Sequence, residues 1–180
     1  MSAVFHDFRP ESPLRRAQEG DPDAFAELVG EHEAMVFSIG YHCTNDRSRA
    51  EELAQDVFLE LYRRLGDIVS DAHLVGWLRQ VTSRRCIDLS RRPWWRKSVS
   101  IDAVAEPPAA ERALDPIRDR RLRALIAALP PRQRLLLTLR YQEELTPAEI
   151  SDIVSLPVNT VKSHLHRALL ALRRGLGERP

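Results

Sequence analysis

The sequence predicts an all-α protein built from two small helical domains, a helical bundle and a helix-turn-helix unit, joined by a flexible linker. Three observations support this prediction. Apolar residues recur at helical spacing through most of the 180-residue chain, and no alternating run of apolar and polar residues is long enough to build a sheet. Four prolines lie between residues 93 and 119 and divide the helical segments into two groups.

The N-terminal group is expected to contain one short helix, at residues 14–19, and three longer ones. Asp21 followed by Pro22 is a typical helix start, because aspartate caps the first turn and proline fits within it. The longer helices are expected at residues 23–43, 48–65 and 73–92, with a polar loop at 66–71. Their expected core positions are Phe25, Leu28, Val29, Met35, Val36, Ile39, Leu53, Val57, Phe58, Leu61, Leu65, Leu74, Trp77, Leu78, Val81 and Ile87.

The C-terminal group is expected to end in a helix-turn-helix. Helices are predicted at residues 120–129, 131–141, 146–154 and 158–174, and Thr146 with Glu149 forms the pattern of a capping box. In the last helix Val158, Val161, Leu165, Ala168, Leu169 and Leu172 share one face. The other face and its edges carry Asn159, Thr160, Lys162, Ser163, His166, Arg167 and Arg174. Such a helix can enter the DNA major groove, and an ordinary hairpin with a hydrated face is the alternative.

These segments predict the domain organisation. We expect a disordered tail at residues 1–13, a first domain at 14–92, a linker at 93–119, a second domain at 120–175 and a tail at 176–180. As a coil the linker would span roughly 25–30 Å. The two domains could therefore occupy separate sites or fold back on each other.

The net charge of +1 conceals blocks of opposite charge. Residues 21–71 contain 12 acidic and 4 basic residues, whereas residues 74–100 contain 7 basic and 1 acidic residue. Residues 158–180 are again basic. Charge segregation of this kind favours different partners for different surfaces. The alternative is that the charged blocks are only the hydrated outer faces of helices.

The acidic and basic blocks suit different ligands. The outer face of the expected helix at 48–65 carries Glu52, Gln55, Asp56, Leu59, Glu60 and Arg63. This strip would repel DNA and suits a basic or polar protein partner, with a hydrated face as the alternative. Arginines at the end of the helix at 73–92 surround Trp94 and Trp95, and basic residues with aromatic rings suit distorted or single-stranded nucleic acid. The two tryptophans would equally suit a protein surface.

Several classes of protein are not supported by the sequence. Cys43 and Cys86 provide no disulfide framework and are expected to be buried apolar groups in a reducing compartment. No apolar run reaches about 18 residues, so no membrane-spanning helix is expected. His42-Cys43 and His164-x-His166 lack the paired spacing of a zinc site, and no catalytic motif is present. We expect no enzyme activity, metal, cofactor, small-molecule substrate or membrane insertion.

Seven short segments resemble a known family. Residues 21–25 (DPDAF), 50–59 (AEELAQDVFL), 77–81 (WLRQV) and 88–92 (DLSRR) are similar to region 2 of bacterial sigma factors of the extracytoplasmic-function (ECF) group. Residues 129–134 (LPPRQR), 145–150 (LTPAEI) and 157–168 (PVNTVKSHLHRA) are similar to region 4. The resemblance covers nearly the whole chain apart from the N-terminal residues and the linker.

The resemblance implies a function and residue roles. It implies a promoter-specificity factor that binds core RNA polymerase and both double-stranded and locally melted promoter DNA, acts in the cytoplasm, and is held inactive, in some cases at the membrane, by an anti-sigma factor. By this resemblance, core polymerase would bind Glu52, Gln55, Asp56, Leu59, Glu60 and Arg63. The loop at 66–73 would capture a flipped base. Contacts to the minus-ten element fall on Asp71, His73, Arg79, Arg84, Arg85, Asp88, Arg91 and Arg92. Contacts to the minus-thirty-five element fall on Asn159, Thr160, Lys162, Ser163, His166, Arg167 and Arg174.

Three departures from the family pattern stand out. Asn159 occupies a position where many members have glycine, and asparagine is able to cap a helix there. His164 stands where arginine is common, which would alter promoter preference. Trp94 and Trp95 have no assigned role. Two other functions remain open: a sigma-like decoy that sequesters an anti-sigma factor, and a response-regulator transcription factor, whose receiver domain would contain strands.

Overall fold

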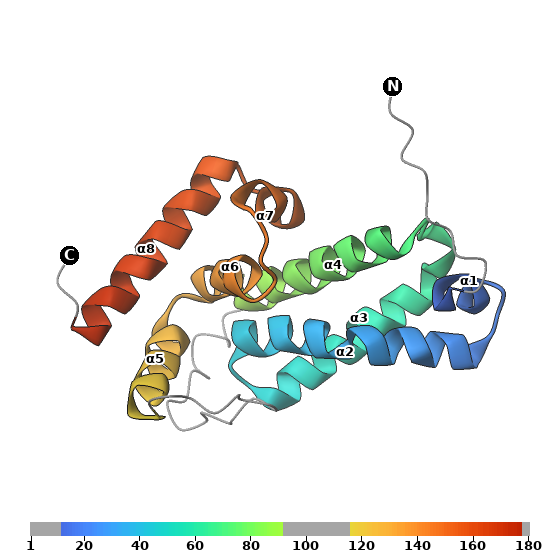
Figure 1. The fold of residues 1–180 in the computed structure, drawn as a ribbon, viewed down its shortest axis with the longest axis horizontal. Helices are drawn as coiled ribbons and strands as arrows, with labels where there is room; N and C mark the ends of the chain where they lie inside the picture. The colour runs from blue at the N-terminus through green and yellow to red at the C-terminus, as the bar shows by residue number, and fades with distance from the viewer. Residues whose placement is uncertain (1–11, 92–115, 178–180) are drawn as a thin grey trace.

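The structure is a computed structural model that describes residues 12–91 and 116–177, and these residues form helices and no strand. Figure 1 shows two groups of helices that lie against each other. The first group is α1 (Pro13–Gln18), α2 (Pro22–Thr44), α3 (Arg47–Arg63), the 3-10 turn η1 (Leu65–Asp67) and α4 (Asp71–Arg91). The second group is α5 (Pro116–Ala128), α6 (Pro131–Tyr141), α7 (Pro147–Val154) and α8 (Val158–Leu176). The predicted all-α class is confirmed.

Local capping signals explain where the helices begin. The Asp21 carboxylate accepts hydrogen bonds from the backbone N–H groups of Asp23 and Ala24 at the start of α2. Asp46 accepts one from the N–H of Arg49 at the start of α3, at 3.1 Å. Each carboxylate satisfies N–H groups that have no partner within the helix.

Several observed helix boundaries differ from the predicted ones, including the end of α3, which is Arg63 rather than residue 65. The predicted loop at 66–71 begins with η1, and α4 starts at Asp71 rather than at residue 73. Helix α5 begins at Pro116, inside the predicted linker, because proline is tolerated in the first helical turn. Helix α8 continues to Leu176 and ends at Gly177, whose φ of 80° suits glycine. Of the predicted tail at 1–13, residues 12 and 13 instead cap and begin α1, and residues 1–11 lie outside the described residues. Most of the predicted linker, with Trp94 and Trp95, and residues 178–180 also lie outside them.

The first group is a helical bundle around α2. Helix α2 packs against α1, α3 and α4. It contributes Leu28, Val36 and Ile39 to the core, and each of these side chains is at most 1% exposed. Trp77, predicted to be in the core, is half-buried and packs against it. This bundle holds the outer faces of α3 and α4 in fixed positions.

The second group shares its core with the first. Helix α6 packs on α2 and α4, and α7 packs on α4. Leu135, Leu136 and Leu139 of α6 are fully buried. The two predicted domains are therefore folded back on each other, and a single apolar cluster runs through both.

A buried arginine joins the two groups. Arg134 of α6 is 2% exposed, and its Nη2 donates a hydrogen bond of 2.7 Å to the carbonyl of Cys43 in the last turn of α2. Its Nη1 donates to the carbonyl of Ala127 at the end of α5. A cation at the C-terminal end of α2 also interacts favourably with the helix dipole. Arg134 thus connects three helices across the boundary between the groups.

Candidate functional site

The predicted outer strip of α3 faces away from the core. We call Glu52, Gln55, Asp56, Leu59, Glu60 and Arg63 the docking strip. All of these side chains are exposed except Glu60, which is half-buried, and Leu59 is a large apolar side chain that is 49% exposed. On the opposite face of the same helix, Leu53, Val57 and Leu61 are buried. The strip therefore combines exposed carboxylates with an exposed apolar contact.

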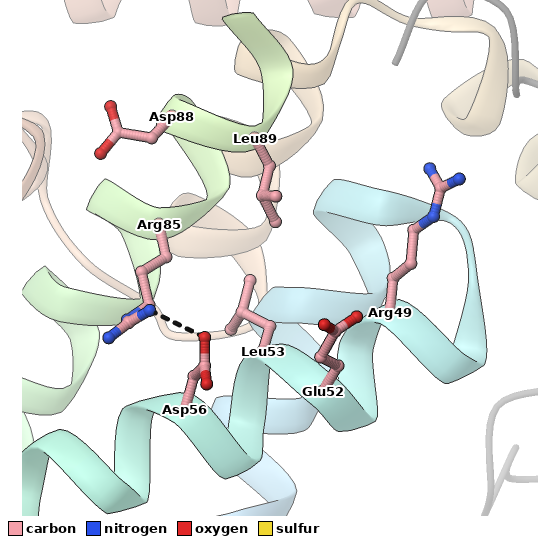
Figure 2. Close-up of a pocket in the computed structure, with 7 residues that line it drawn as sticks. All are labelled: Arg49, Glu52, Leu53, Asp56, Arg85, Asp88 and Leu89. Atoms are coloured by element: carbon pink, nitrogen blue, oxygen red, sulfur yellow. Dashed lines mark hydrogen bonds and ion pairs between the residues drawn. The ribbon is translucent and has the colours of Figure 1, made fainter. Parts of the chain in front are cut away.

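A groove of about 300 Å³ separates the docking strip from α4. Figure 2 shows Arg85 of α4 pointing across it toward Asp56. Arg85 Nη1 lies 3.0 Å from Asp56 Oδ2, and its Nη2 lies 2.8 Å from Glu60 Oε2. An arginine that the sequence assigned to DNA is therefore bound by two carboxylates of the strip. The other residues that line the groove are Arg49, Glu52, Leu53, Asp88 and Leu89.

The predicted minus-ten residues of α4 fall into two groups. Asp71, His73, Arg84, Asp88 and Arg91 are exposed, and only a long ion pair of 3.8 Å links Arg91 to Asp88. Arg79 and Arg85 are half-buried, and Arg92 lies outside the described residues.

Arg79 is bound by a carboxylate from the second group of helices. Its Nε and Nη2 donate to one oxygen of Glu143, at 2.9 and 2.8 Å. The two side chains are only 23% and 11% exposed, so the pair is shielded from solvent. In this arrangement the guanidinium of Arg79 is paired with a carboxylate, as is that of Arg85.

The loop before α4 is held by a residue that the sequence gave no reason to select. The side-chain amide of Gln18 in α1 donates to the carbonyls of Leu65 and Ile68, at 2.9 and 2.7 Å. His73 Nδ1 accepts a hydrogen bond of 3.1 Å from the N–H of Val69. The side chain of Val69 is 55% exposed. The predicted base-capture loop is therefore fixed at its buried side and open at its outer side.

The predicted minus-thirty-five residues lie together on α8. Val161, Leu165, Ala168 and Leu172 are buried on its inner face. Thr160 is half-buried, and the others are exposed: Asn159, Lys162, Ser163, His166, Arg167 and Arg174. The helix therefore presents a face of cations and hydrogen-bonding groups, as the spacing predicted.

Two details of α8 differ from expectation. Pro157 occupies the N-cap position, so Asn159 lies inside the first turn and does not cap the helix. Its carbonyl accepts a hydrogen bond of 2.8 Å from the hydroxyl of Ser163. His164 is half-buried, and burial, followed by the charges of Arg167 and Arg132, lowers its pKa. His164 is therefore held toward its neutral form.

The helix before α8 has a well-defined start and end. The Thr146 hydroxyl accepts from the N–H of Glu149, and the Glu149 carboxylate accepts from the Thr146 N–H at 2.7 Å, which completes the predicted capping box. Hydrogen bonds from Thr146 lower the pKa of Glu149. Ser155 ends α7 in the left-handed conformation, with φ of 52°. Helices α7 and α8 pack on each other and on α6, which is the packing of a helix-turn-helix unit.

Among residues 12–91 and 116–177, no group of three or more histidine, cysteine or acidic side chains is arranged to hold a metal ion. No helix within residues 12–91 or 116–177 is both long enough and apolar enough to cross a bilayer.

An acidic strip on one helix of a bundle, followed by a helix-turn-helix with an exposed basic face, is the arrangement of a DNA-binding transcription initiation factor. Comparison with known families agrees with this class. The family described as Sigma-70 region 2 matches residues 28–96, and Sigma-70 region 4 matches residues 119–172. Together the two matches cover more than half of the chain.

Individual relatives resemble the chain over most of its length. The ECF RNA polymerase sigma factor SigW of Bacillus subtilis is 26% identical over 91% of this chain and 94% of its own. The ECF sigma factor SigK of Mycolicibacterium vanbaalenii is 29% identical over 91% of this chain and 87% of its own. The chain belongs to the ECF group of RNA polymerase sigma factors and is a promoter-specificity factor for transcription initiation.

Solved structures show the same fold. The sigma factor RpoE of Bartonella quintana, in complex with the anti-sigma factor NepR, has a TM-score of 0.69 at 19% identity over 87% of this chain and 98% of its own. CnrH, in complex with the cytosolic domain of CnrY, has a TM-score of 0.64 at 18% identity over 93% of this chain and 97% of its own.

Proposed function

We propose that the chain guides core RNA polymerase to its promoters through three separate surfaces. The docking strip on α3 binds the polymerase, the exposed face of α4 with the preceding loop binds the minus-ten element, and the exposed face of α8 binds the minus-thirty-five element. The observation that carries this proposal is the charge separation: exposed carboxylates gather on α3, whereas the exposed face of α8 carries Lys162, Arg167 and Arg174. Nucleotide chemistry belongs to the polymerase, so the chain itself is not an enzyme.

Recognition at the minus-ten element requires melted DNA. Extracting one base from the stack costs a few kcal/mol, which contacts in a pocket must offset. The loop that ends at His73 is supported from behind by Gln18, so it is ordered before DNA arrives. Arg84 and Arg91 are exposed further along α4 and suit the phosphates of the separated strand.

Recognition at the minus-thirty-five element uses duplex DNA. The exposed face of α8 fits the major groove, where a recognition helix contacts base edges with its first turns. Lys162 and Arg167 are long enough to reach base edges or phosphates, and Ser163 offers a hydroxyl. Arg174 lies near the end of the helix, where it suits the DNA backbone.

We also propose that an anti-sigma factor controls the chain in the cytoplasm. The relative from Bartonella quintana was solved with an anti-sigma factor, and CnrH was solved with the cytosolic domain of its partner. An inhibitor that is itself anchored would hold the chain at the membrane. The partner that binds this chain would keep Arg79 paired with Glu143 and so withhold that cation from DNA.

Reconstituted run-off transcription tests the proposed function. Purified chain, core polymerase and a library of genomic promoter fragments should give discrete transcripts that are absent when the chain is omitted. A decoy would bind an anti-sigma factor but yield no transcript with any fragment. A response-regulator factor is not favoured, because described residues 12–91 contain no strand of a receiver domain.

The docking strip can be tested separately from DNA binding. Glu52→Lys should weaken binding to core polymerase about tenfold, since it places a cation in an acidic strip. Glu31→Lys, an equal charge change at an exposed position of α2, serves as the matched control and should bind normally. Equal affinities of the two variants for polymerase would contradict the assignment of the strip.

A further inference from the structure

Arg85 lies on α4, the helix proposed to bind the minus-ten element, but its side chain contacts the docking strip on α3. On α4 it follows exposed Arg84 and lies three residues before exposed Asp88. Its guanidinium nevertheless turns away from that surface and crosses the groove between α4 and α3, as Figure 2 shows for its bond to Asp56. Two proposed binding surfaces are therefore joined through one side chain.

Arg85 lies against two carboxylates, those of Asp56 and Glu60. Glu60 also has a second, longer ion pair, with Arg64 Nε at 3.9 Å, so only Asp56 depends on Arg85 alone among the ion pairs of this cluster. The side chains of Arg85, Asp56 and Glu60 are 34%, 56% and 31% exposed. Ion pairs at such partly hydrated positions contribute little to stability, which makes this contact exchangeable.

The guanidinium is also incompletely bonded. Arg85 Nε is buried and has no hydrogen-bond partner among residues 12–91 and 116–177. Arginine carries five N–H donors, arranged so that a phosphate or carboxylate can accept two of them side by side. A donor buried without a partner is unfavourable, so another position of the side chain is able to compete with this one.

A basic protein surface that docks on the strip would compete for the same carboxylates. Complementary charge attracts lysine and arginine side chains to Asp56 and Glu60. Once these carboxylates are occupied, Arg85 loses its counter-ions. A phosphate held against the exposed face of α4, beside Arg84, then competes for Arg85 with Asp88, which lines the same groove.

We propose that Arg85 is a transferable counter-ion that couples polymerase docking to minus-ten DNA binding. In the free chain it neutralises Asp56 and Glu60, and in the holoenzyme it pairs with a DNA phosphate. The inference rests on the proposed function, because it takes the docking strip as the polymerase site. Since coupling between two binding sites is reciprocal, DNA bound to α4 should also strengthen the hold of polymerase on the strip.

A set of substitutions tests the exchange. Arg85→Met removes the charge and keeps a long side chain in the groove. The pair Asp56→Asn and Glu60→Gln releases Arg85 from its carboxylates. The pair Glu51→Gln and Glu52→Gln removes the same charge from α3 without touching Arg85, whose carboxylate partners are Asp56 and Glu60. Circular dichroism and thermal melting verify that each full-length variant folds.

DNA affinity is measured by fluorescence anisotropy with a labelled minus-ten fork-junction oligonucleotide, for the free chain and for the holoenzyme, over a series of salt concentrations. In the free chain, Arg85→Met should change the DNA affinity less than about twofold, because the side chain is already occupied. In the holoenzyme it should weaken DNA binding about tenfold and lower the salt slope by about one phosphate contact. It should also strengthen binding of the chain to core polymerase.

The double-mutant cycle gives the decisive comparison. Asp56→Asn with Glu60→Gln should raise the DNA affinity of the free chain, and adding Arg85→Met should abolish most of the gain. The pair Glu51→Gln and Glu52→Gln should change the DNA affinity of the free chain by the same factor whether or not Arg85→Met is also present. Equal effects of Arg85→Met in free chain and holoenzyme, or no effect in either, overturn the inference while leaving the proposed function intact. A wild-type chain that fails to bind core polymerase overturns both.

Discussion

If the proposed function is correct, Arg167 is the residue that we expect to contribute most directly to recognition of the upstream element. It is exposed on α8 in the third turn of the recognition helix. A guanidinium in the major groove can pair with two acceptors of one guanine or bind a phosphate. Its charge also contributes to the pKa depression at His164, so Arg167 influences the electrostatics of neighbouring positions as well.

Arg167→Ala should weaken the free energy of binding to the minus-thirty-five element by about 1–3 kcal/mol, the usual cost of losing a base contact. The salt dependence of DNA binding should become shallower by about one phosphate contact. Footprinting of the holoenzyme measures both quantities. Arg47→Ala, which removes a charge paired with Glu51 at the start of α3, is the matched control. Footprints of equal strength for Arg167→Ala and wild type would refute the assignment.

Ser155 holds the turn of the helix-turn-helix in a conformation that disfavours a side chain. Its φ is 52°, and its N–H donates to the carbonyl of Ser151. Left-handed backbone is unfavourable for residues with a Cβ, whereas glycine adopts it readily. Ser155→Gly should therefore stabilise the chain by about 0.5–1 kcal/mol.

Thermal melting measures this effect. Ala148→Gly at an exposed position of α7 is the control, and it should destabilise by about 1 kcal/mol because glycine there loses more backbone entropy. Opposite shifts of the melting temperature for the two glycines identify backbone conformation as the cause. A destabilising Ser155→Gly would show that the serine side chain matters more than its φ.

At the scale of elements, α5 and α8 pack closely where Gly175 of α8 has no Cβ. A Cβ at Gly175 would lie 2.3 and 2.7 Å from the two methyl carbons of Leu125 and 3.0 Å from its Cγ. Arg121 Nη2 also donates to the Gly175 carbonyl, at 2.6 Å. A larger residue at position 175 would therefore fit only if the Leu125 side chain moved.

Gly175→Ala should destabilise the chain by about 1–3 kcal/mol, because the new Cβ forces the Leu125 side chain out of its packed position. Leu125→Ala added to Gly175→Ala should restore part of the loss. Gly30→Ala is the control: nothing lies within 4 Å of a Cβ at this exposed helical position, so it should stabilise by about 0.5–1 kcal/mol. Chemical denaturation measures all three, and a neutral Gly175→Ala would contradict the packing.

The elements also show how far the sequence could be interpreted. Asp21, Asp46 and Thr146 mark helix starts with local hydrogen bonds, so the beginnings of α2, α3 and α7 were predictable to within a few residues. The outward faces of α3 and α8 followed from helical periodicity, because burial of one face leaves the other exposed. These predictions need only information from neighbouring residues.

Contacts between distant residues left no such signal. Arg79 and Glu143 are 64 residues apart and Gln18 is 47 residues from Leu65. The pairing of Arg85 with Asp56 depends on the packing of α4 against α3. Two arginines that the family resemblance assigned to DNA, Arg79 and Arg85, are therefore bound to carboxylates, since only the tertiary structure determines which charges meet.

At the scale of the whole molecule, a short polar chain joins the two halves beside Arg134. The Ser38 hydroxyl donates to Gln142 Oε1 at 3.1 Å, and Gln142 Nε2 lies 2.9 Å from His42 Nε2. With the Gln142 amide in this orientation its nitrogen donates, so His42 Nε2 accepts and carries no proton. Burial, followed by the charge of Arg134, lowers the pKa of His42.

The packing of the two halves should therefore depend on pH. A histidine whose pKa is lowered in the packed state binds fewer protons there than in the open state, where its pKa is near the ordinary 6.5. The contribution of His42 is thus complete above about pH 6.5 and decreases as the pH falls below that value. Protonation would also bring a second cation close to Arg134.

Small-angle scattering, or energy transfer between labels on α2 and α8, should show the chain opening as the pH is lowered from 7.5 to 5.5, the range in which histidine titrates. His42→Gln should make the separation of the halves much less dependent on pH, because glutamine cannot gain a proton. His164, whose pKa is also lowered, lies on α8 away from this contact, so His164→Gln should retain the pH-dependent opening. If His164→Gln rather than His42→Gln abolished the opening, the pH dependence would arise within the helix-turn-helix instead of between the halves.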